Sequence, residues 1–149
     1  MKRWPMSHYL ETARVLRVEG FAPLFIFGPK ETELYATHGD QIENMGGFVY
    51  RSHNYQIQLL AGILSQCALL LTNDCAVMHV GAAVGCRVLA LFGPSDSRIW
   101  FPYNTPWNQV IERDMPCRRE CCNGCELLSC LARIPPEEVL AKLRTMLPK

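Results

Sequence analysis

The stretch that decides the fold is residues 67–94, CALLLTNDCAVMHVGAAVGCRVLALFGP. It holds two apolar runs, CALLLT and RVLALF, and between them a segment of small residues that stops at Gly85. The runs predict strands and the segment over residues 75–84 predicts a helix, which together make a βαβ unit. Because both runs are continuously apolar, we expect a parallel sheet with helices on both faces.

The carboxyl ends of the two predicted strands carry residues that a ligand would meet. Asn73 and Asp74 follow the first strand, and Gly93 and Pro94 follow the second. In open α/β sheets, ligands bind outside these ends. The helix after Asp74 is expected to present free N–H groups and the positive end of its dipole, an arrangement that suits phosphate.

Composition narrows the class of protein. A chain of 149 residues predicts one domain, residues 1–149. A net charge of +1 with scattered Lys and Arg argues against nucleic acid as the main partner. No apolar run reaches the roughly 18 residues of a membrane span, and the N-terminus lacks the apolar core of a signal peptide. We therefore expect a cytoplasmic protein.

The rest of the chain continues the alternation of helix and strand. Helices are expected from a Ser7 cap to Gly20, over 31–37, after an Asn54 cap and from Pro135 onward, with one further helical turn after Pro94. Strands are expected over 22–27, 47–50 and 109–111. The prediction is an α/β fold with a Rossmann-like, mostly parallel sheet flanked by helices. Neither G-x-G-x-x-G nor a Walker A motif is present, so the usual cofactor fingerprints are missing.

Several motifs in order resemble glycosyltransferase family 9, the ADP-heptose:lipopolysaccharide heptosyltransferases. The family pattern, approximately N-D-[TS]-G-x-M-H-x-A-A-A-x-G, resembles residues 73–85, and F-G-P-[TS]-D matches residues 92–96. KRWP at residues 2–5 looks like the family's K-x-W-P, and GPKE at 28–31 looks like its G-x-x-x-E region. The tail, PC at 116–117 and PEEV at 136–139, also follows the family.

The resemblance implies the C-terminal, donor-binding half of a GT-B enzyme, apparently without that half's first strand. The N-terminal domain that carries the acceptor-side base is expected to be missing from this chain. A complete enzyme would transfer a heptose from ADP-heptose, the nucleotide-sugar substrate, to a lipopolysaccharide core acceptor, with no further cofactor. The implied location is cytoplasmic, at the inner face of the inner membrane, which is compatible with peripheral membrane contact.

The resemblance also assigns candidate residues. Lys2 would offset negative charge on the departing ADP, and its alternative interpretation is an ordinary solvated lysine. His79 would lie near the diphosphate, and its alternative interpretation is a histidine bonded within the core or to the neighbouring loop. Asp74 is either part of the donor pocket or a helix cap. Glu31 either accepts from ribose hydroxyls or only stabilises a helix start. The remaining expected donor contacts are Cys75, Ala76, Val77, Met78, Gly93, Pro94, Ser95 and Asp96.

Two of these positions depart from the family pattern. Cys75 stands where the family has a hydroxyl residue, and Ala76 stands where it has glycine. A thiol is a weaker donor than a hydroxyl, and alanine restricts the close approach of the backbone. The alternative function is therefore a degenerate, non-catalytic nucleotide-binding or interaction module, and this chain alone is expected to be inactive.

Five cysteines crowd the loop over residues 117–130. Cys122 and Cys125 have the spacing of metal ligands, and Cys117 or Cys121 with Cys130 would complete a thiolate site. Disulfide or redox pairing and plain reduced cysteines are the other readings, and the last is preferred, so no metal site is assigned. A small metal-binding α/β protein is the third functional hypothesis.

Overall fold

A computed structural model describes residues 3–54, 56–102, 105–113 and 129–147. The chain divides into two compact units, and each is described by itself. The smaller unit is Met6–Ile57, and the larger unit combines Met1–Pro5 with Gln58–Lys149. Every strand pair in both units is parallel, so the predicted α/β fold with a parallel sheet is confirmed. The prediction of a single domain stays a prediction.

The smaller unit packs two helices on a two-stranded sheet. It contains α1 (Met6–Val18), β1 (Leu24–Phe27), α2 (Thr32–Asn44) and β2 (Phe48–Arg51), and β1 pairs with β2. Its core is formed by Leu10, Phe27 and Ile42, one residue from each of α1, β1 and α2. Helix α1 begins at Met6, so Ser7 lies inside the helix and does not cap it, contrary to the sequence prediction.

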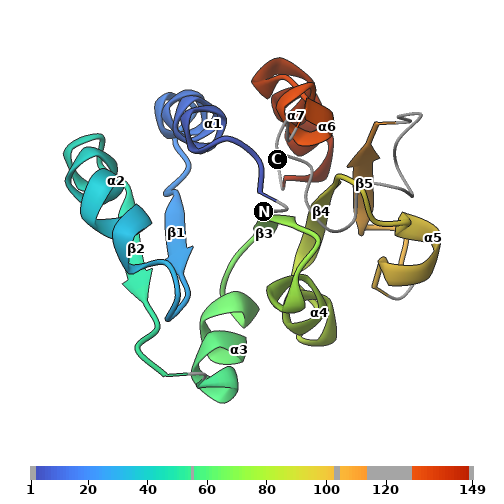
Figure 1. Cartoon of the computed structure of the whole chain (residues 1–149), viewed down its shortest axis with the longest axis horizontal. Coiled ribbons are helices and arrows are strands. Elements are labelled where there is room, and N and C mark those ends of the chain that lie inside the picture. Colours follow the sequence, from blue (N-terminus) through green and yellow to red (C-terminus); the bar gives the residue numbers. More distant parts are fainter. Residues whose placement is uncertain (1–2, 55, 103–104, 114–128, 148–149) are drawn as a thin grey trace. The chain divides into compact units, whose positions relative to one another are not determined.

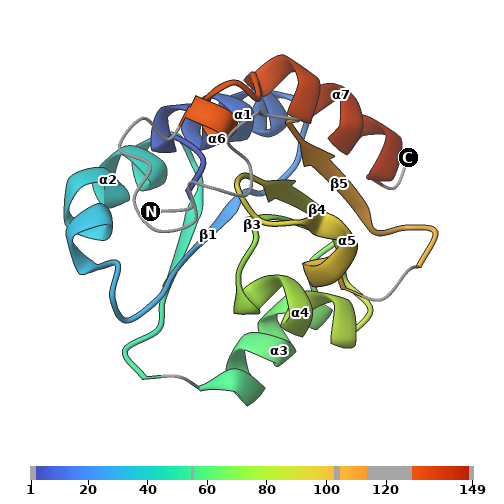
Figure 2. The same ribbon diagram turned by 45° about the vertical axis from the view of Figure 1, so that its right-hand side comes forward.

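The larger unit contains the central βαβ segment. Its sheet has the order β3 (Leu69–Asn73), β4 (Arg87–Phe92) and β5 (Gln109–Glu112). Residues 88–92 of β4 are fully buried, as expected for a strand with partners on both sides and helices on both faces. Figures 1 and 2 show α4 (Ala76–Ala83) on one face of this sheet and α7 (Pro136–Met146) on the other.

Three shorter elements complete the larger unit. Helix α3 (Ile57–Ser65) precedes β3 and begins beyond Asn54, which therefore is not its cap. Helix α5 (Ser97–Trp100) is the single turn expected after Pro94, and α6 (Ser129–Ala132) was not predicted. In the described part of the chain, no helix is both long enough and apolar enough to cross a membrane.

Helix α4 lies close to the sheet because Gly81 has no side chain where the helix meets β3 and β4. A Cβ atom added at Gly81 would lie 2.7 Å from Leu70 Cδ2 on β3 and 3.5 Å from Val88 Cγ2 on β4. Gly85 ends the helix with φ +79°, a left-handed conformation that glycine adopts without strain. The sequence prediction of a helix that stops at Gly85 is therefore confirmed, and its N-terminus is fixed relative to the ends of β3 and β4.

Candidate functional site

The first turn of α4 is the centre of the candidate site. Cys75 is its N-cap residue, with extended backbone (φ −158°, ψ 172°), and its side chain makes no capping hydrogen bond. The Cys75 Sγ atom instead lies 3.4 Å from Thr72 Oγ1. Cys75 and Ala76 are exposed, and Val77 is half-buried. Because Cys75 and Ala76 are exposed, the positive end of the helix dipole lies at the surface, which suits an anion.

Asp74 precedes this turn and is not the helix cap. Its N–H donates to Leu91 O at 3.3 Å, which extends the pairing of β3 with β4 by one residue. The cap reading of Asp74 is thus wrong because the chain stays extended through Cys75. Asp74 is half-buried, and its part in a donor pocket stays a prediction.

The two residues that follow in the motif lie on different sides of α4. Met78 is fully buried, and its N–H donates to Cys75 O at 3.1 Å. The structure therefore gives Met78 a packing role and does not support the prediction that it contacts a donor. His79 is exposed on the same helix, which does not support the alternative of a core histidine. Its part near a diphosphate stays a prediction.

The loop after β4 is used mainly to build the next turn. Ser95 is buried, with 6% of its surface exposed. Asp96 caps α5, since its Oδ1 accepts from the Arg98 N–H at 3.0 Å and its Oδ2 pairs with Arg98 Nη2 at 2.7 Å. The alternative that Asp96 starts the next turn is therefore what the structure shows, and donor contacts from Pro94, Ser95 and Asp96 stay predictions.

A close approach favours glycine at position 93. A Cβ atom at this position would lie 3.1 Å from Leu131 Cγ and 3.2 Å from Cys130 Sγ. Glycine therefore lets α6 pack directly against the carboxyl end of β4. This gives Gly93 a structural reason that sequence reasoning missed, because the contact joins residues far apart in the chain.

The N-terminal segment is tied to the same end of the sheet. Trp4 is fully buried, its backbone N–H donates to Asn73 Oδ1 at 2.9 Å, and its indole N–H donates to Ile134 O at 2.9 Å. Sequence reasoning expected Trp4 to pack against the core and placed Asn73 at the ligand-binding end of the sheet, but it did not foresee the hydrogen bond between them. Lys2, the predicted catalytic cation, lies outside the described residues, and its role stays a prediction.

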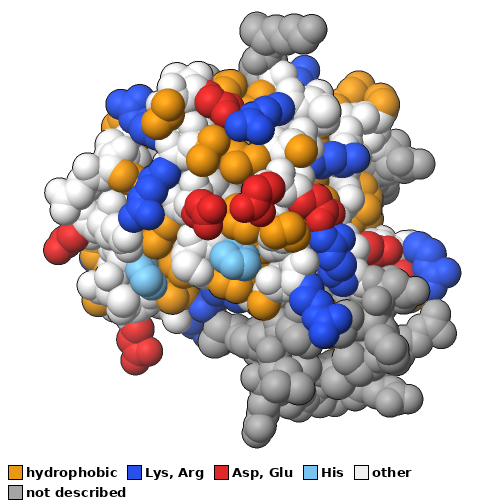
Figure 3. All heavy atoms as spheres, turned by 90° about the horizontal axis from the view of Figure 1, so that it is seen from above, with side chains coloured by type: hydrophobic (Ala, Val, Ile, Leu, Met, Phe, Trp, Pro, Cys, Tyr) orange, Lys and Arg blue, Asp and Glu red, His pale blue; other side chains and the backbone are white. Residues whose placement is uncertain are grey.

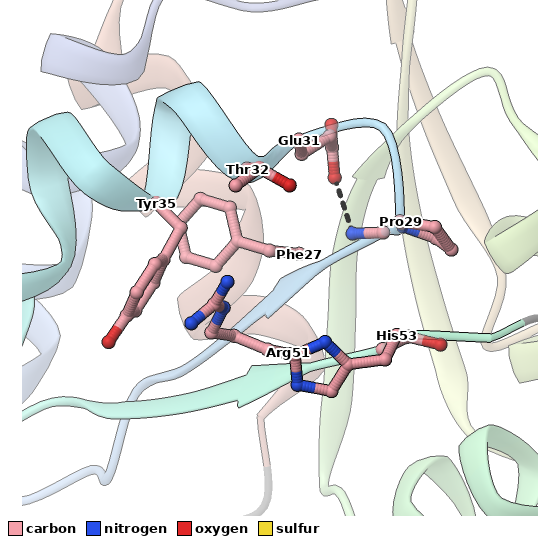
Figure 4. A pocket seen from close by; sticks show the side chains of 9 residues that line it. Phe27, Pro29, Glu31, Thr32, Tyr35, Arg51 and His53 are labelled. Atoms are coloured by element: carbon pink, nitrogen blue, oxygen red, sulfur yellow. Dashed lines mark hydrogen bonds between the residues drawn. The ribbon is translucent and has the colours of Figure 1, made fainter.

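The smaller unit has a pocket at the carboxyl ends of its strands (Figure 4). One oxygen of the Glu31 carboxylate accepts from the Gly28 N–H at 2.8 Å. The Arg51 guanidinium lies 3.9 Å from the centre of the Tyr35 ring, and His53 lies beside it. Glu31 therefore fixes the turn after β1 and also lines the pocket, so both readings of this residue remain open. Sequence reasoning missed Tyr35, Arg51 and His53.

Charge on the face drawn in Figure 3 is mixed. The face in Figure 3 carries Lys and Arg interspersed with Asp and Glu and with hydrophobic side chains. Among the described residues, no group of three or more His, Cys, Asp or Glu is arranged to hold a metal. Of the clustered cysteines, Cys130 is half-buried on α6, and positions 117, 121, 122 and 125 lie outside the described residues. The readings of that cluster stay predictions.

Parallel strands alternating with helices, with a helix start directly beyond the carboxyl end of β3, define a protein of the Rossmann-like α/β class. The pattern of glycosyltransferase family 9 (heptosyltransferase) matches residues 1–128. The chain belongs to this family.

Individual relatives agree with this assignment. Lipooligosaccharide heptosyltransferase 2 of Haemophilus influenzae is 28% identical over 153 residues, which cover 99% of this chain and 44% of the relative. Lipopolysaccharide heptosyltransferase 2 of Salmonella typhimurium is 32% identical over 102 residues, covering 63% of this chain and 28% of the relative. The chain thus spans less than half the length of these relatives.

Solved structures confirm the fold. The family 9 glycosyltransferase of Veillonella parvula superposes with a TM-score of 0.79 at 28% identity, over 97% of this chain and 42% of that one. The ADP-heptose LPS heptosyltransferase II of E. coli superposes with a TM-score of 0.78 at 26% identity, again over 97% of this chain and 42% of that one. The predicted Rossmann-like fold and the predicted family are both confirmed.

Proposed function

We propose that this chain binds the nucleotide-sugar donor of a heptosyltransferase, ADP-heptose, and that the start of α4 receives the donor's diphosphate. The observation that carries the proposal is the solvent-exposed, uncapped first turn of α4 directly after Asn73 and Asp74. Amides and a helix dipole bind anions without needing a particular side chain. The heptosyltransferase names of the relatives supply the substrate class.

In the complete reaction, the bond between the sugar's anomeric carbon and a diphosphate oxygen breaks. A bond from that carbon to an acceptor hydroxyl oxygen forms, and the hydroxyl proton passes to a base that the acceptor-binding half would supply. ADP departs with an added negative charge. The amides of α4 and the cation of Lys2 would stabilise that charge as it develops, which lowers the barrier. This chain alone is proposed to bind ADP weakly and to transfer nothing.

We further propose a lipopolysaccharide core acceptor, bound through an N-terminal domain, and a cytoplasmic location at the inner face of the inner membrane. The acceptor rests on the names of the relatives, a lipooligosaccharide and a lipopolysaccharide heptosyltransferase, and the location rests on the family resemblance alone. Glu31 is proposed as a ribose contact within the pocket of the smaller unit. Glu31→Gln keeps an acceptor for the Gly28 N–H but removes the charge, so it should weaken ADP binding more than it lowers stability.

The test separates stability from binding at Cys75. Cys75→Asp places a carboxylate at the N-cap, which should stabilise the chain by about 1 kcal/mol and repel a diphosphate. Cys75→Ser is the matched control, since it supplies a neutral cap and a hydroxyl of the family type. We expect isothermal titration to show ADP binding by wild type and Cys75→Ser and none by Cys75→Asp, although Cys75→Asp melts higher. Unchanged ADP affinity in a stabilised Cys75→Asp would exclude the α4 start as the site.

The degenerate binding module is the second candidate, favoured by Cys75 and Ala76 at positions where the family has a hydroxyl residue and glycine. Cys75→Thr with Ala76→Gly restores the family pattern and should tighten ADP binding. Ala83→Gly, at the other end of α4, controls for the cost of glycine in this helix. If the double variant binds ADP no better than wild type, the start of α4 is not the donor pocket.

A further inference from the structure

Two thiols lie at the amino-terminal end of the larger unit's sheet, opposite the candidate site. Cys67 comes two residues before β3, Cys86 comes one residue before β4, and both are free cysteines. The Cys86 Sγ atom lies 3.6 Å from the Cys67 carbonyl oxygen, so the two residues are in contact. Neither thiol takes part in the proposed donor site.

The backbone holds both cysteines in place. Their N–H groups donate to carbonyl oxygens in the last turns of α3 and α4, at 3.1 Å for Cys67 and 3.0 Å for Cys86. Leu69 and Arg87 are register partners in β3 and β4, so the two cysteines stand one step out of register. Because neighbouring strands lie about 4.8 Å apart and a strand rises about 3.3 Å per residue, their Cα atoms are about 6 Å apart. A disulfide joins Cα atoms about 4.4–6.8 Å apart, so this pair can be bridged.

The two thiols differ in their access to solvent. Cys86 is buried, whereas Cys67 is half-buried and its Sγ lies 3.4 Å from Ile63 O. Burial, and after it the charge interaction with the Cys67 thiol, raise the pKa of Cys86 to about 11, which agrees with two thiols that lie close together. A reagent in solution therefore reaches Cys67 first, and Cys86 reacts only with what has formed on its neighbour.

We propose that Cys67 and Cys86 form a modification site, a dithiol pair that a low-molecular-weight disulfide such as glutathione disulfide oxidises to an intrachain disulfide. The new bond would close a loop that contains β3 and α4, and it would tie the end of α3 to the start of β4. Closing such a loop stabilises the folded state by restricting the unfolded chain. The inference is independent of the proposed function, because it concerns the other end of the sheet.

The modification consists of two thiol–disulfide exchanges. The Cys67 thiolate attacks one sulfur of glutathione disulfide, which forms a mixed disulfide and releases one glutathione thiolate. The Cys86 thiolate then attacks the Cys67 sulfur, which forms the intrachain bond and releases the second glutathione thiolate. The protein loses two electrons and two protons in all; the glutathione disulfide accepts the electrons, and the protons convert the two released thiolates to thiols.

The link can be mapped on the wild-type chain. Trypsin releases residues 52–87 as one peptide, which holds three cysteines. An Asp-directed protease cleaves it before Asp74 and cyanogen bromide cleaves it after Met78, which gives three fragments with one cysteine each. Only a Cys67–Cys86 bond joins the first fragment to the third, and a reductant separates them again.

The experiment equilibrates the chain with mixtures of oxidised and reduced glutathione, in buffer and in concentrated urea. We expect the equilibrium constant for forming the link to be at least about tenfold larger in the folded chain, because the fold holds the two cysteines together. By thermodynamic linkage, the linked chain should then unfold at a higher urea concentration than the reduced chain.

Two matched variants test the order of the exchanges. With oxidised glutathione, Cys86→Ala should retain glutathione on Cys67, because the second thiol is missing. Cys67→Ala should leave Cys86 unmodified, because that thiol is buried. Glutathione on Cys86 in folded Cys67→Ala would overturn this order.

The proposal itself is decided on wild type and does not depend on the folding of any variant. An equilibrium constant that is no larger in the folded chain than in urea would overturn it. A folded chain in which Cys67 is joined to a cysteine other than Cys86 would overturn it as well.

Discussion

Cys86 is expected to make this chain less stable as the pH rises in the alkaline range. Its thiol is buried, with 4% of its surface exposed, and its Sγ lies 3.6 Å from the carbonyl oxygens of Cys67 and Arg87. Burial, and then the neighbouring Cys67 thiol, raise the pKa of Cys86 from the ordinary 9.0 to about 11. Burial also raises the pKa of Cys67. Ionising Cys86 would place a thiolate against carbonyl oxygens that its S–H now faces.

The direction of the pH dependence follows from the number of protons that the folded and unfolded states hold. In the unfolded chain the thiol loses its proton near pH 9.0, whereas in the folded chain it keeps the proton until pH about 11. The folded state therefore holds more protons between these values, and the free energy of unfolding falls as pH rises through this window. Two pH units correspond to a loss of at most about 3 kcal/mol. Below pH 9 this group contributes no pH dependence.

Urea denaturation at half-unit steps from pH 8 to pH 11, with a reductant that prevents disulfides, measures this loss. Tyrosines, lysines and the other cysteines also titrate there, so the informative quantity is the difference between wild type and Cys86→Ala. Wild type should lose about 1–3 kcal/mol more than the variant across the window. Cys75→Ala, which removes an exposed thiol, should match wild type. Parallel curves for wild type and Cys86→Ala would refute the reasoning.

Three further predictions concern stability, each measured by urea denaturation at neutral pH. Trp4→Phe removes the indole N–H, leaves the buried Ile134 carbonyl without its donor and creates a cavity. It should lower the free energy of unfolding by about 2–4 kcal/mol, and a decrease below about 1 kcal/mol would contradict the buried hydrogen bond. Gly85→Ala should cost about 1–2 kcal/mol because of its positive φ, whereas Gly62→Ala, inside α3 with open space around it, should stabilise by up to about 1 kcal/mol. Arg113→Gln breaks a half-exposed ion pair with Glu138 and should cost no more than about 1 kcal/mol, decreasing with salt.

Local pattern was enough to predict the central unit. β4 covers the six residues RVLALF. The sequence predicted this strand because a continuous apolar run that ends at Gly-Pro is typical of a buried strand. The second half of α2 was missed for a specific reason. Gly39 and its polar neighbours argue against a helix, yet a Cβ atom at Gly39 would lie 2.8 Å from the Tyr35 ring one turn earlier, so the ring takes the space that a side chain would need. Helix propensities of single residues do not report such packing.

The candidate site shows the same division. Its position at the strand ends followed from periodicity and from the rule for open sheets. Its partners did not, because Trp4 meets Asn73 and Ile134 across 69 and 130 residues of sequence. The α6 helix and its approach to Gly93 were likewise invisible, since a four-residue helix in a cysteine-rich loop has no periodic signal. Long-range hydrogen bonds and close approaches are set by the folded chain as a whole.

The polar side chains at this end of the sheet are mostly engaged in building it. Asp96 caps α5, Asn73 holds Trp4, and Ser95 is buried. At the start of α4 the exposed residues are Cys75 and Ala76, which have small side chains. We expect these small side chains to matter chiefly because they do not block access to the main chain. A charged or bulky residue at position 75 or 76 should therefore harm anion binding more than loss of the thiol, which is why Cys75→Asp, and not Cys75→Ala, is the decisive variant.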